Sequence, residues 1–479
     1  MKKLLLWFLP VSLLSHMSQA QDKWDLRRCV TYALANNISI KQADVQARLN
    51  KLTLDQSRLS QIPTLGLGAS AAVISGRQNV NAFTLTNVTY FYNNYSLQSN
   101  ANLFNFGSLR NSIQANRYAW QASLASTEKT KNDISLNVAN AYLQVLLAAE
   151  QAEAGRAKLQ LTQSQLEITR KQVKAGTLPE LNAAELESQA AQDSSNLINL
   201  VGQIQLNVLG LKAYMGLDAS TPFDVDTPPV DEIPVGTLAD MQPEIVYALA
   251  LANQPQQKAD ALTIEANRKM VASNRGAMYP SFSLQGSLGT NYASNAQDLV
   301  PNSTPHPTID TSKTIFVLGT TTPIVQYGLT YDTRKTPYFT QLSNNFNQYV
   351  GLNVSIPIFN GGTLRTNYAR SKLNLRNAEL QRDQDNLTLK NNIYQAYTAA
   401  LTALQKFEAN KISVAASGKS ADFSQKRYAV GMLNTVDLLI NQNNYFNAKI
   451  NLLSSQYDYV FKMKVLEFYK GMGIKLSKE

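Results

Sequence analysis

The sequence predicts an internally duplicated α+β membrane protein in which β-hairpins alternate with very long α-helices. Three observations predict it. The second half of the chain repeats the first at a constant spacing. In each half, a run of alternating apolar and small or polar residues gives way to a long helical stretch without proline. The first twenty residues have the layout of a secretory signal, which directs a chain out of the cytoplasm.

Residues 1–20 are predicted to be a cleaved signal peptide. Lys2 and Lys3 form the charged start, residues 4–14 form a short apolar stretch, and Ala20 ends a small-residue cleavage site. The alternative is an uncleaved anchor, but this stretch falls short of the ~20 apolar residues that a spanning helix needs. No later stretch is long and apolar enough either, so any membrane-spanning part is expected to be a β-barrel.

Composition argues against an enzyme and against a metalloprotein. Beyond residue 20 the chain has one cysteine, Cys29, and one histidine, His306, which excludes a disulfide framework and a His/Cys metal cluster. Composition leaves carboxylate-only chemistry open, but no paired acidic motif stands out, so we expect no catalytic residues, no cofactor and no bound metal. The formal net charge of the whole chain is +10, and eleven Lys/Arg face five Asp/Glu within residues 363–430. Nucleic-acid binding would require interleaved aromatic residues or a known module, so a solvated helix face is favoured over an anion-attracting lumen, and no nucleic-acid partner is expected.

The internal repeat decides the fold class. With an offset of 255, residues in the first half recur in the second, as in Phe104 with Phe359, Asn105 with Asn360, Gly176 with Gly431, and Tyr142 with Tyr397. Upstream the offset falls to 216–217, so that Pro63 matches Pro280. The sequence therefore predicts a duplication whose second copy carries a longer hairpin loop.

The repeat predicts the domain organisation. Residues 21–221 form a first repeat, residues 222–243 a proline-rich linker at the mid-height of the rods, and residues 244–479 a second repeat. Each repeat is expected to contain an initial helix, a β-hairpin, a long helix and a return helix, at 25–61, 64–104, 108–175 and 182–214 in the first and at 243–278, 281–359, 363–430 and 437–470 in the second.

The hairpin strands alternate with period two. Leu65, Leu67 and Val73 alternate with small residues in the first copy, and residues 350–358 alternate in the second, where Ile356 and Ile358 continue the pattern. Runs of this length match the ~9–11 residue strands of membrane barrels. Hairpin loops are expected at 76–94 and 293–348. Four strands per chain cannot close a barrel, and open edges in lipid are costly, so the chain must oligomerise.

The long helices predict an elongated coiled coil. Residues 108–175 and 363–430 contain no proline, and at ~1.5 Å per residue each forms a rod of roughly 100 Å. Apolar residues recur with heptad-like spacing around Tyr142 and Tyr397, which are expected to pack between helices. Each rod is predicted to end in a turn at Gly176 or Gly431, since glycine adopts positive φ readily.

Together these features resemble the TolC-like outer-membrane efflux family over the whole mature chain, and residues 428–439 are similar to that family's periplasmic tip motif. The resemblance implies a homotrimer, with a twelve-stranded barrel in outer-membrane lipid continuous with a periplasmic α-helical coiled-coil barrel. It implies a channel-tunnel of a tripartite export system, passively conducting drugs, toxins or other substrates from an inner-membrane transporter and a periplasmic adaptor. A trimeric coiled-coil adhesive protein with a barrel anchor is the alternative, although such proteins usually anchor at one end of the chain.

The resemblance also implies a gate and adaptor-docking region at the tips. In the family, acidic residues after the second turn line a constriction, and Asp437 matches the first of them, while Ile440 stands where a second is common. Leu433 replaces a locking arginine, and Tyr428 is expected to belong to the lock. Asp437 is equally well explained as a first-turn acid behind an Asn434/Thr435 cap. The candidate tip residues are Gly176, Leu178, Glu180, Asn182, Tyr428, Gly431, Leu433 and Asp437, and the candidate strand–helix junctions are Pro63, Pro280, Phe104, Asn105, Phe359 and Asn360.

Overall fold

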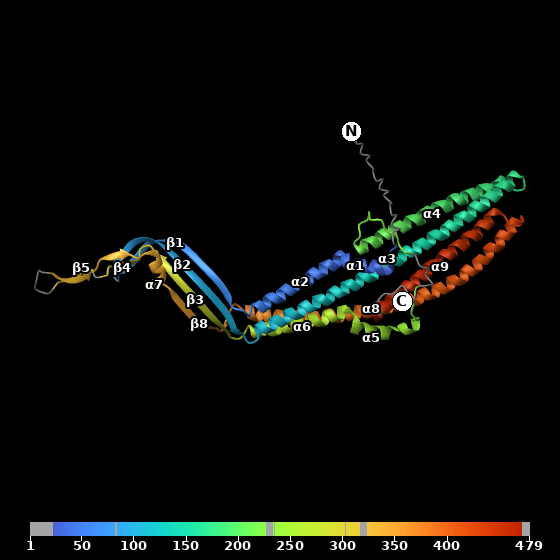
Figure 1. Ribbon diagram of the computed structural model, residues 1–479. Helices are drawn as coiled ribbons and strands as arrows, with labels where there is room; N and C mark the ends of the chain where they lie inside the picture. Colours follow the sequence, from blue (N-terminus) through green and yellow to red (C-terminus); the bar gives the residue numbers. More distant parts are fainter. Residues whose placement is uncertain are drawn as a thin grey trace, which may run out of the picture. The chain divides into compact units, whose positions relative to one another are not determined.

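The structure, a computed structural model, describes residues 23–81, 84–226, 233, 235–301, 303–316 and 323–471. The predicted signal peptide and part of the proline-rich linker lie outside these residues. The chain divides into two compact units, one made of Met1–Asn50, Tyr118–Glu265 and Arg376–Glu479, the other of Lys51–Arg117 and Ala266–Leu375. The first is helical, and the second contains the main sheet (Figure 1).

Helices of equal length occur at corresponding places in the two halves of the chain. The long helices have 67 residues each, the return helices 36, and the initial segments 11 and 22. In chain order they are α1 (Leu26–Asn36), α2 (Ile38–Leu59), α3 (Ser108–Lys174), α4 (Glu180–Met215), α5 (Pro243–Asn253), α6 (Pro255–Gly276), α8 (Thr363–Ala429) and α9 (Thr435–Lys470), with a short 3-10 helix η2 (Leu238–Met241) before α5. Both return helices begin two residues earlier than the sequence predicts.

Each initial helix is broken into two, where a single helix was predicted. Asn37 is extended between α1 and α2, and its side-chain oxygen accepts from the N–H of Ser39 at 2.8 Å, so it caps α2. Gln254 occupies the equivalent break before Pro255, because a residue that precedes proline avoids the helical conformation. Both side chains also donate to the carbonyl groups at the end of a return helix, Asn37 to Tyr214 at 2.7 Å and Gln254 to Phe468 at 3.2 Å.

Two apolar clusters hold the middle of the helical unit. One joins α1, α3, α4 and α9, and Tyr142 lies in it with its hydroxyl donating to the carbonyl of Asp226 at 2.6 Å. The other joins η2, α5, α8 and α9, and Tyr397 packs against it. Both tyrosines therefore pack between helices, as predicted. Because α1, α5 and the described part of the linker pack in this region, the hairpins beyond it depend on contacts among α3, α4, α8 and α9.

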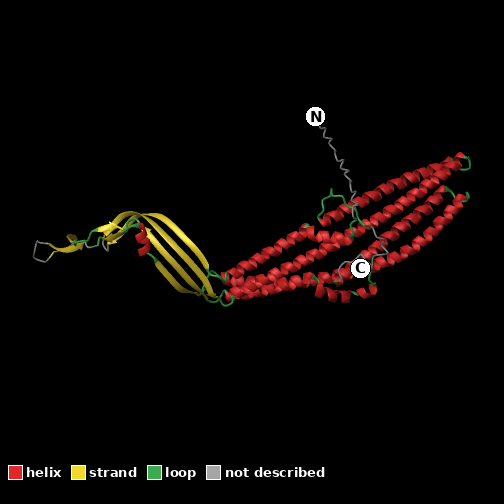
Figure 2. Cartoon of the chain, viewed as in Figure 1, coloured by secondary structure: helices red, strands yellow, loops and turns green. Residues whose placement is uncertain are grey.

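The second unit contains a four-stranded antiparallel sheet with the order β1-β2-β3-β8 (Figure 2). Its strands are β1 (Thr64–Asn81), β2 (Thr84–Phe104), β3 (Ser281–Ala293) and β8 (Asn347–Ser355). The prediction of a loop at 76–94 was wrong, since Gly76 pairs with Val88 and both strands continue beyond that pair. The prediction that β8 includes Ile356 and Ile358 was also wrong, because Pro357 lacks the N–H that a ladder needs.

The strand register divides this sheet into two chemically different faces. Residues paired directly across strands share a face. Leu67 pairs with Leu97, which pairs with Leu288, whereas Gly66 pairs with Gln98, which pairs with Ser287. The first face collects exposed apolar side chains, and the second is mostly glycine, serine, asparagine and glutamine. The apolar residues are Leu65, Leu67, Val73, Leu97, Ala101, Leu284, Leu288, Val350, Leu352 and Val354.

The predicted second loop is largely structured. It contains the pair β4 (Gln297–Leu299) and β7 (Thr333–Lys335), the pair β5 (His306–Phe316) and β6 (Pro323–Thr330), and a short helix α7 (Tyr338–Asn344). Helix α7 packs on β3. Among the helices of the described residues, none is long and apolar enough to cross a membrane.

Candidate functional site: the helical hairpin tips

The two hairpins of the helical unit end in turns of the same design. Gly176 and Gly431 have φ angles of 74° and 75°, in the left-handed region. After α3, the N–H of Thr177 donates to the carbonyl of Gln172 at 3.0 Å, and after α8 the N–H of Met432 donates to Arg427 at 2.9 Å. The N–H groups of the two glycines donate to the carbonyl groups three residues earlier, Val173 and Tyr428. Together these bonds form a Schellman motif at each tip.

The return helices begin differently. Asn434 caps α9, since its side-chain oxygen accepts from the N–H of Asp437 at 2.7 Å and its amide nitrogen donates to the Asp437 carboxylate at 3.0 Å. Asp437 is thus engaged in the cap, which is one of the two roles that the sequence left open. Helix α4 follows Pro179 without a side-chain cap, and Glu180 is the acid of its first turn.

The remaining predicted tip residues lie around these turns. Glu180 and Asp437 are exposed, and Leu178, Asn182 and Leu433 are half-buried. Among the described residues, no ion pair joins Glu180 or Asp437 to a basic side chain. The tips of the single chain therefore have no salt bridge at the predicted gate positions.

Tyr428 links the two hairpins. Its hydroxyl lies 3.1 Å from the hydroxyl of Thr169, a fully buried residue of α3. The sequence placed Tyr428 beside Gly431. The backbone of Tyr428 does lie beside Gly431, since the Gly431 N–H donates to the Tyr428 carbonyl. The side chain of Tyr428 instead contacts the other hairpin.

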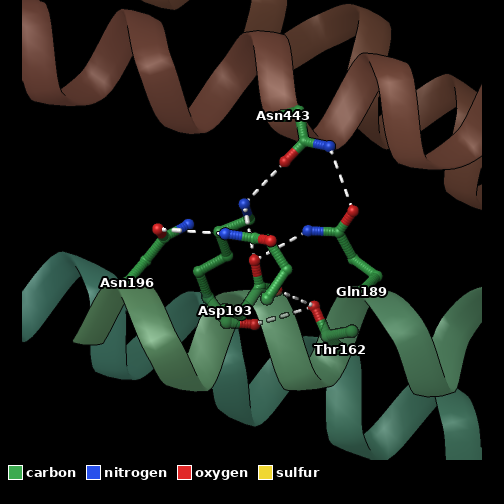
Figure 3. A network of polar contacts seen from close by, with 7 residues as sticks. Thr162, Gln189, Asp193, Asn196 and Asn443 are labelled. Atoms are coloured by element: carbon green, nitrogen blue, oxygen red, sulfur yellow. Dashed lines mark hydrogen bonds and ion pairs between the residues drawn. The ribbon is translucent and has the colours of Figure 1, made fainter. Parts of the chain in front are cut away.

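A closed polar network lies further along the same interface (Figure 3). The Asp193 side chain on α4 is 1% exposed, and it pairs with Lys158 of α3 at 2.8 Å. It also accepts from Thr162 at 2.7 Å and from Gln189 at 2.8 Å. Lys158 donates to Asn443 of α9 at 2.6 Å, and Asn443 donates back to Gln189 at 3.4 Å, so the network joins the first hairpin to the second.

Beyond the apolar cluster around Tyr142, this interface contains further polar contacts. Gln151 of α3 donates to Ser454 of α9 at 3.0 Å, on the other side of Lys158 from Thr169. Two buried amide atoms, Gln165 Oε1 and Gln442 Nε2, have no hydrogen-bond partner within the described chain. Unsatisfied buried polar atoms cost free energy, and hydrogen bonds contribute less than an apolar core of the same extent. Part of the contact between the two hairpins is consequently made by hydrogen bonds that can exchange for water.

The sequence reasoning missed Lys158, Thr162, Thr169, Asp193 and Asn443. A signal existed, because Lys158, Thr162, Gln165 and Thr169 follow one another at intervals of four, three and four, which is the spacing of a coiled-coil seam. Polar residues at such positions predict a buried polar interface. Their partners on α4, α8 and α9 carry no comparable local signal.

The predicted strand–helix junctions lie where strands meet helices. Asn105 accepts from the N–H of Ser108 through its carbonyl and from Leu109 through its side chain, so it begins α3. Phe104 packs against Phe282 with ring centroids 6.2 Å apart. Asn360 accepts from Thr363 at the start of α8, and the neighbouring Phe359 is 87% exposed. Pro63 and Pro280 separate α2 from β1 and α6 from β3.

A family model described as outer membrane efflux protein matches residues 30–217 and 246–468. The chain belongs to this family. The family resemblance predicted from the sequence is thereby confirmed, and with it the location in the outer membrane with a tunnel that extends into the periplasm. Members of this family are channels, and this member is the outer-membrane channel of a tripartite efflux or secretion system.

The chain is similar to TolC proteins and to solved channels over most of their length. It is 23% identical over 474 residues to the outer membrane protein TolC of Escherichia coli (strain K12), covering 96% of this chain and 84% of that protein. Its fold matches the CmeC outer membrane channel of Campylobacter jejuni with a TM-score of 0.72 at 18% identity, covering 95% of this chain and 87% of that one. The CusC structure matches with a TM-score of 0.72 at 16% identity, covering 94% and 92% of the two chains.

Proposed function

We propose that three copies of this chain form one passive duct through the outer membrane. Twelve strands would form a barrel in lipid, and the helices would form a coiled-coil tunnel below it. An inner-membrane transporter would deliver drugs, toxins or other substrates, and a periplasmic adaptor would bind the hairpin tips. The duct itself would supply passage and a gate, without catalysis, cofactor or metal.

The observation that carries this proposal is the two-faced sheet with open edges. In the described sheet, β1 and β8 each pair with one strand, so one edge of each is left without a partner. Leu67 and Val350, on the apolar face, are 80% and 78% exposed. A lipid-facing apolar side and a water-facing polar side are what a membrane barrel requires, and its closure satisfies both edges.

Two exposed apolar seams on the helices support assembly of several chains. On α2, exposed apolar residues recur every seven positions, at Ile38, Val45, Leu52 and Leu59. On α8 the same spacing recurs at Leu373, Leu380, Leu387, Tyr394 and Leu401. A heptad seam is the surface that a partner helix covers. Since the seams and the sheet edges differ from one another, contact between copies would be head-to-tail, an arrangement that forms a ring when the rotation between copies closes.

The gate is proposed at the tips. Gly176, Leu178, Glu180 and Asn182 on one hairpin and Tyr428, Gly431, Leu433 and Asp437 on the other would form the constriction and the surface for the adaptor. The polar interface between α3 and α9, with the Tyr428–Thr169 bond near its end, would hold the hairpins together when the duct is closed. Opening would exchange these hydrogen bonds for water.

Electron microscopy and mass measurement of the detergent-solubilised protein test the proposal. A tapered tube containing three chains is expected, together with ion-conducting channels in planar bilayers. Leu380→Glu with Leu387→Glu should abolish the trimer, because two charges would enter the α8 seam. Thr388→Glu, an exposed neighbour outside the seam, should leave it intact. A monomer, a fibre or a non-conducting particle from the unmodified chain would reject the proposal.

A further inference from the structure

Helix α7 lies on the apolar face of the sheet. The hydroxyl of Thr290 donates to the carbonyl of Leu342 at 2.7 Å, and the hydroxyls of Tyr338 and Tyr95 lie 2.8 Å apart. Thr290 pairs with Tyr95 in the register, and both belong to the face that carries Leu97 and Leu288. The helix therefore covers the sheet on the side proposed to meet lipid.

The helix is firmly fixed in this place. Gln341 is 3% exposed, and its side chain bonds with both the N–H and the carbonyl of Ala293, at the end of β3. The same side chain donates to the carbonyl of Thr336 at 2.9 Å. Tyr338 packs on Tyr292 with ring centroids 4.7 Å apart. An aromatic element that is hydrogen-bonded to the end of β3 thus stands at one end of the apolar face.

Phe339 is the exposed part of this element. It contacts Tyr338 edge to face at 5.4 Å, yet it is 81% exposed. Burial in the fold does not account for a phenylalanine in that position, since a free aromatic ring in water is unfavourable. Aromatic side chains at the ends of membrane strands prefer the boundary between acyl chains and headgroups.

Two basic residues lie just before the helix. Arg334 and Lys335 are exposed on β7, four and three residues before Tyr338 respectively. Even fully extended, four residues of chain span at most about 14 Å. Asp298 is opposite Arg334 in the β4–β7 register, but within the described residues no ion pair joins them. The nearby Asp332 lies 3.6 Å from His306 instead. The two cations are therefore available to an external anion.

We propose that α7 and the Arg334–Lys335 pair form a lipid-binding anchor, in which Phe339 enters the acyl-chain boundary and the two cations bind lipid phosphate groups. This inference rests on the proposed function, because it needs the apolar face to meet lipid. Phe339 lies next to the apolar sheet face, where the acyl chains of a leaflet would be. Arg334 and Lys335 lie toward the end of the strands, where the anionic headgroups would be. Basic residues near an anionic leaflet each add to binding.

A labelling experiment tests the aromatic part. Phe339→Cys in the full-length trimer would carry an environment-sensitive dye, and Cys29 should stay unlabelled because burial raises the pKa of its thiol to about 12. In phosphatidylcholine vesicles with brominated acyl chains, quenching of this dye is expected. Phe423→Cys, an exposed phenylalanine of α8, is the matched control and should not be quenched. Quenching of the Phe339→Cys dye by aqueous iodide alone would overturn the proposal.

A charge experiment tests the cationic part independently. The Arg334→Gln/Lys335→Gln variant should lose on the order of tenfold in the retention of phosphatidylglycerol over phosphatidylcholine, measured by mass spectrometry of trimers released from mixed bilayers. Lys411→Gln/Lys419→Gln, on exposed positions of α8, is the control. Equal retention by both variants would overturn the anchor. Conductance measured on the unmodified trimer separates the anchor from the proposed function. Trimers that conduct ions but show no preference for phosphatidylglycerol reject only the anchor, whereas trimers that do not conduct reject the duct.

Discussion

The hydroxyl groups of Tyr428 on α8 and Thr169 on α3 lie 3.1 Å apart and connect the two helical hairpins near their tips. Thr169 is fully buried, so this bond is shielded from water on one side. Helix α8 ends one residue after Tyr428, and the Gly431 turn follows. Breaking or lengthening this bond would therefore be expected to change the geometry of the tip at Gly431.

Tyr428→Phe should loosen the closed duct. The substitution removes one buried hydroxyl contact, worth about 1 kcal/mol, while it keeps the ring. Single-channel recordings should show higher conductance or a larger open fraction than the unmodified chain. Tyr142→Phe, which removes a comparable 2.6 Å bond to the carbonyl of Asp226 away from the tips, is the control. If Tyr428→Phe combined with Asp437→Ala conducts like the unmodified channel, neither residue belongs to the gate.

Asp193→Ala should destabilise the helical unit strongly. It leaves the Lys158 ammonium buried without its carboxylate, and breaking a buried pair in this way costs about 3–5 kcal/mol. Denaturant unfolding should show the loss, and Lys158→Met together with Asp193→Leu should recover much of it, because the two substitutions remove both charges. Glu167→Gln, in the exposed pair with Lys171, should not measurably change the unfolding midpoint. Equal effects of Asp193→Ala and Glu167→Gln would contradict the network.

The contribution of Asp260 to the stability of the helical unit should fall as pH rises from about 4 to 6. Burial, and then the neighbouring carboxylate of Asp385, raise the pKa of Asp260 to about 6, against an ordinary value near 4, while Gln256 and Arg382 oppose the shift. A raised folded-state pKa means that the stabilisation is complete below the unfolded pKa and is lost as pH rises through the folded one.

Asp260→Asn should flatten this pH dependence. Unfolding temperatures at pH 4.5 and pH 7 would measure it, with Glu408→Gln, an exposed acid of α8, as the control. If the unfolding temperature of Asp260→Asn depends on pH as strongly as that of the unmodified chain, the Asp260 carboxyl is not the group that titrates.

Leu352→Lys should impair insertion into membranes far more than Asn353→Lys. The two residues are adjacent on β8, and their side chains point to the apolar and the polar face. A lysine on the lipid face of a membrane strand costs about 2–4 kcal/mol at the bilayer midplane, whereas one in the lumen costs little. The amount of folded trimer recovered in the membrane fraction reports this difference. Similar recovery of both variants would mean that the sheet does not face lipid.

Much of the fold followed from local patterns in the sequence. Proline-free stretches and glycine turns predicted helices that the structure ends at Lys174 and Ala429, within one residue of the predicted ends. Such patterns are readable because helix and turn preferences act over a few residues. The break at Asn37 was missed because its cap competes with a helical pattern that continues on both sides.

The candidate site shows the same difference between local patterns and tertiary contacts. By itself the sequence determined the glycine turns at Gly176 and Gly431 and the candidate acid Asp437, since each rests on residues close together in the chain, and it determined the family resemblance through a pattern that repeats along the chain. Only the tertiary structure decided that Tyr428 bonds Thr169, that Lys158 is buried between Asp193 and Asn443, and that α7 lies on the apolar face. Those contacts join residues 35 to 285 positions apart, and they depend on which helices and strands become neighbours, which no local preference specifies.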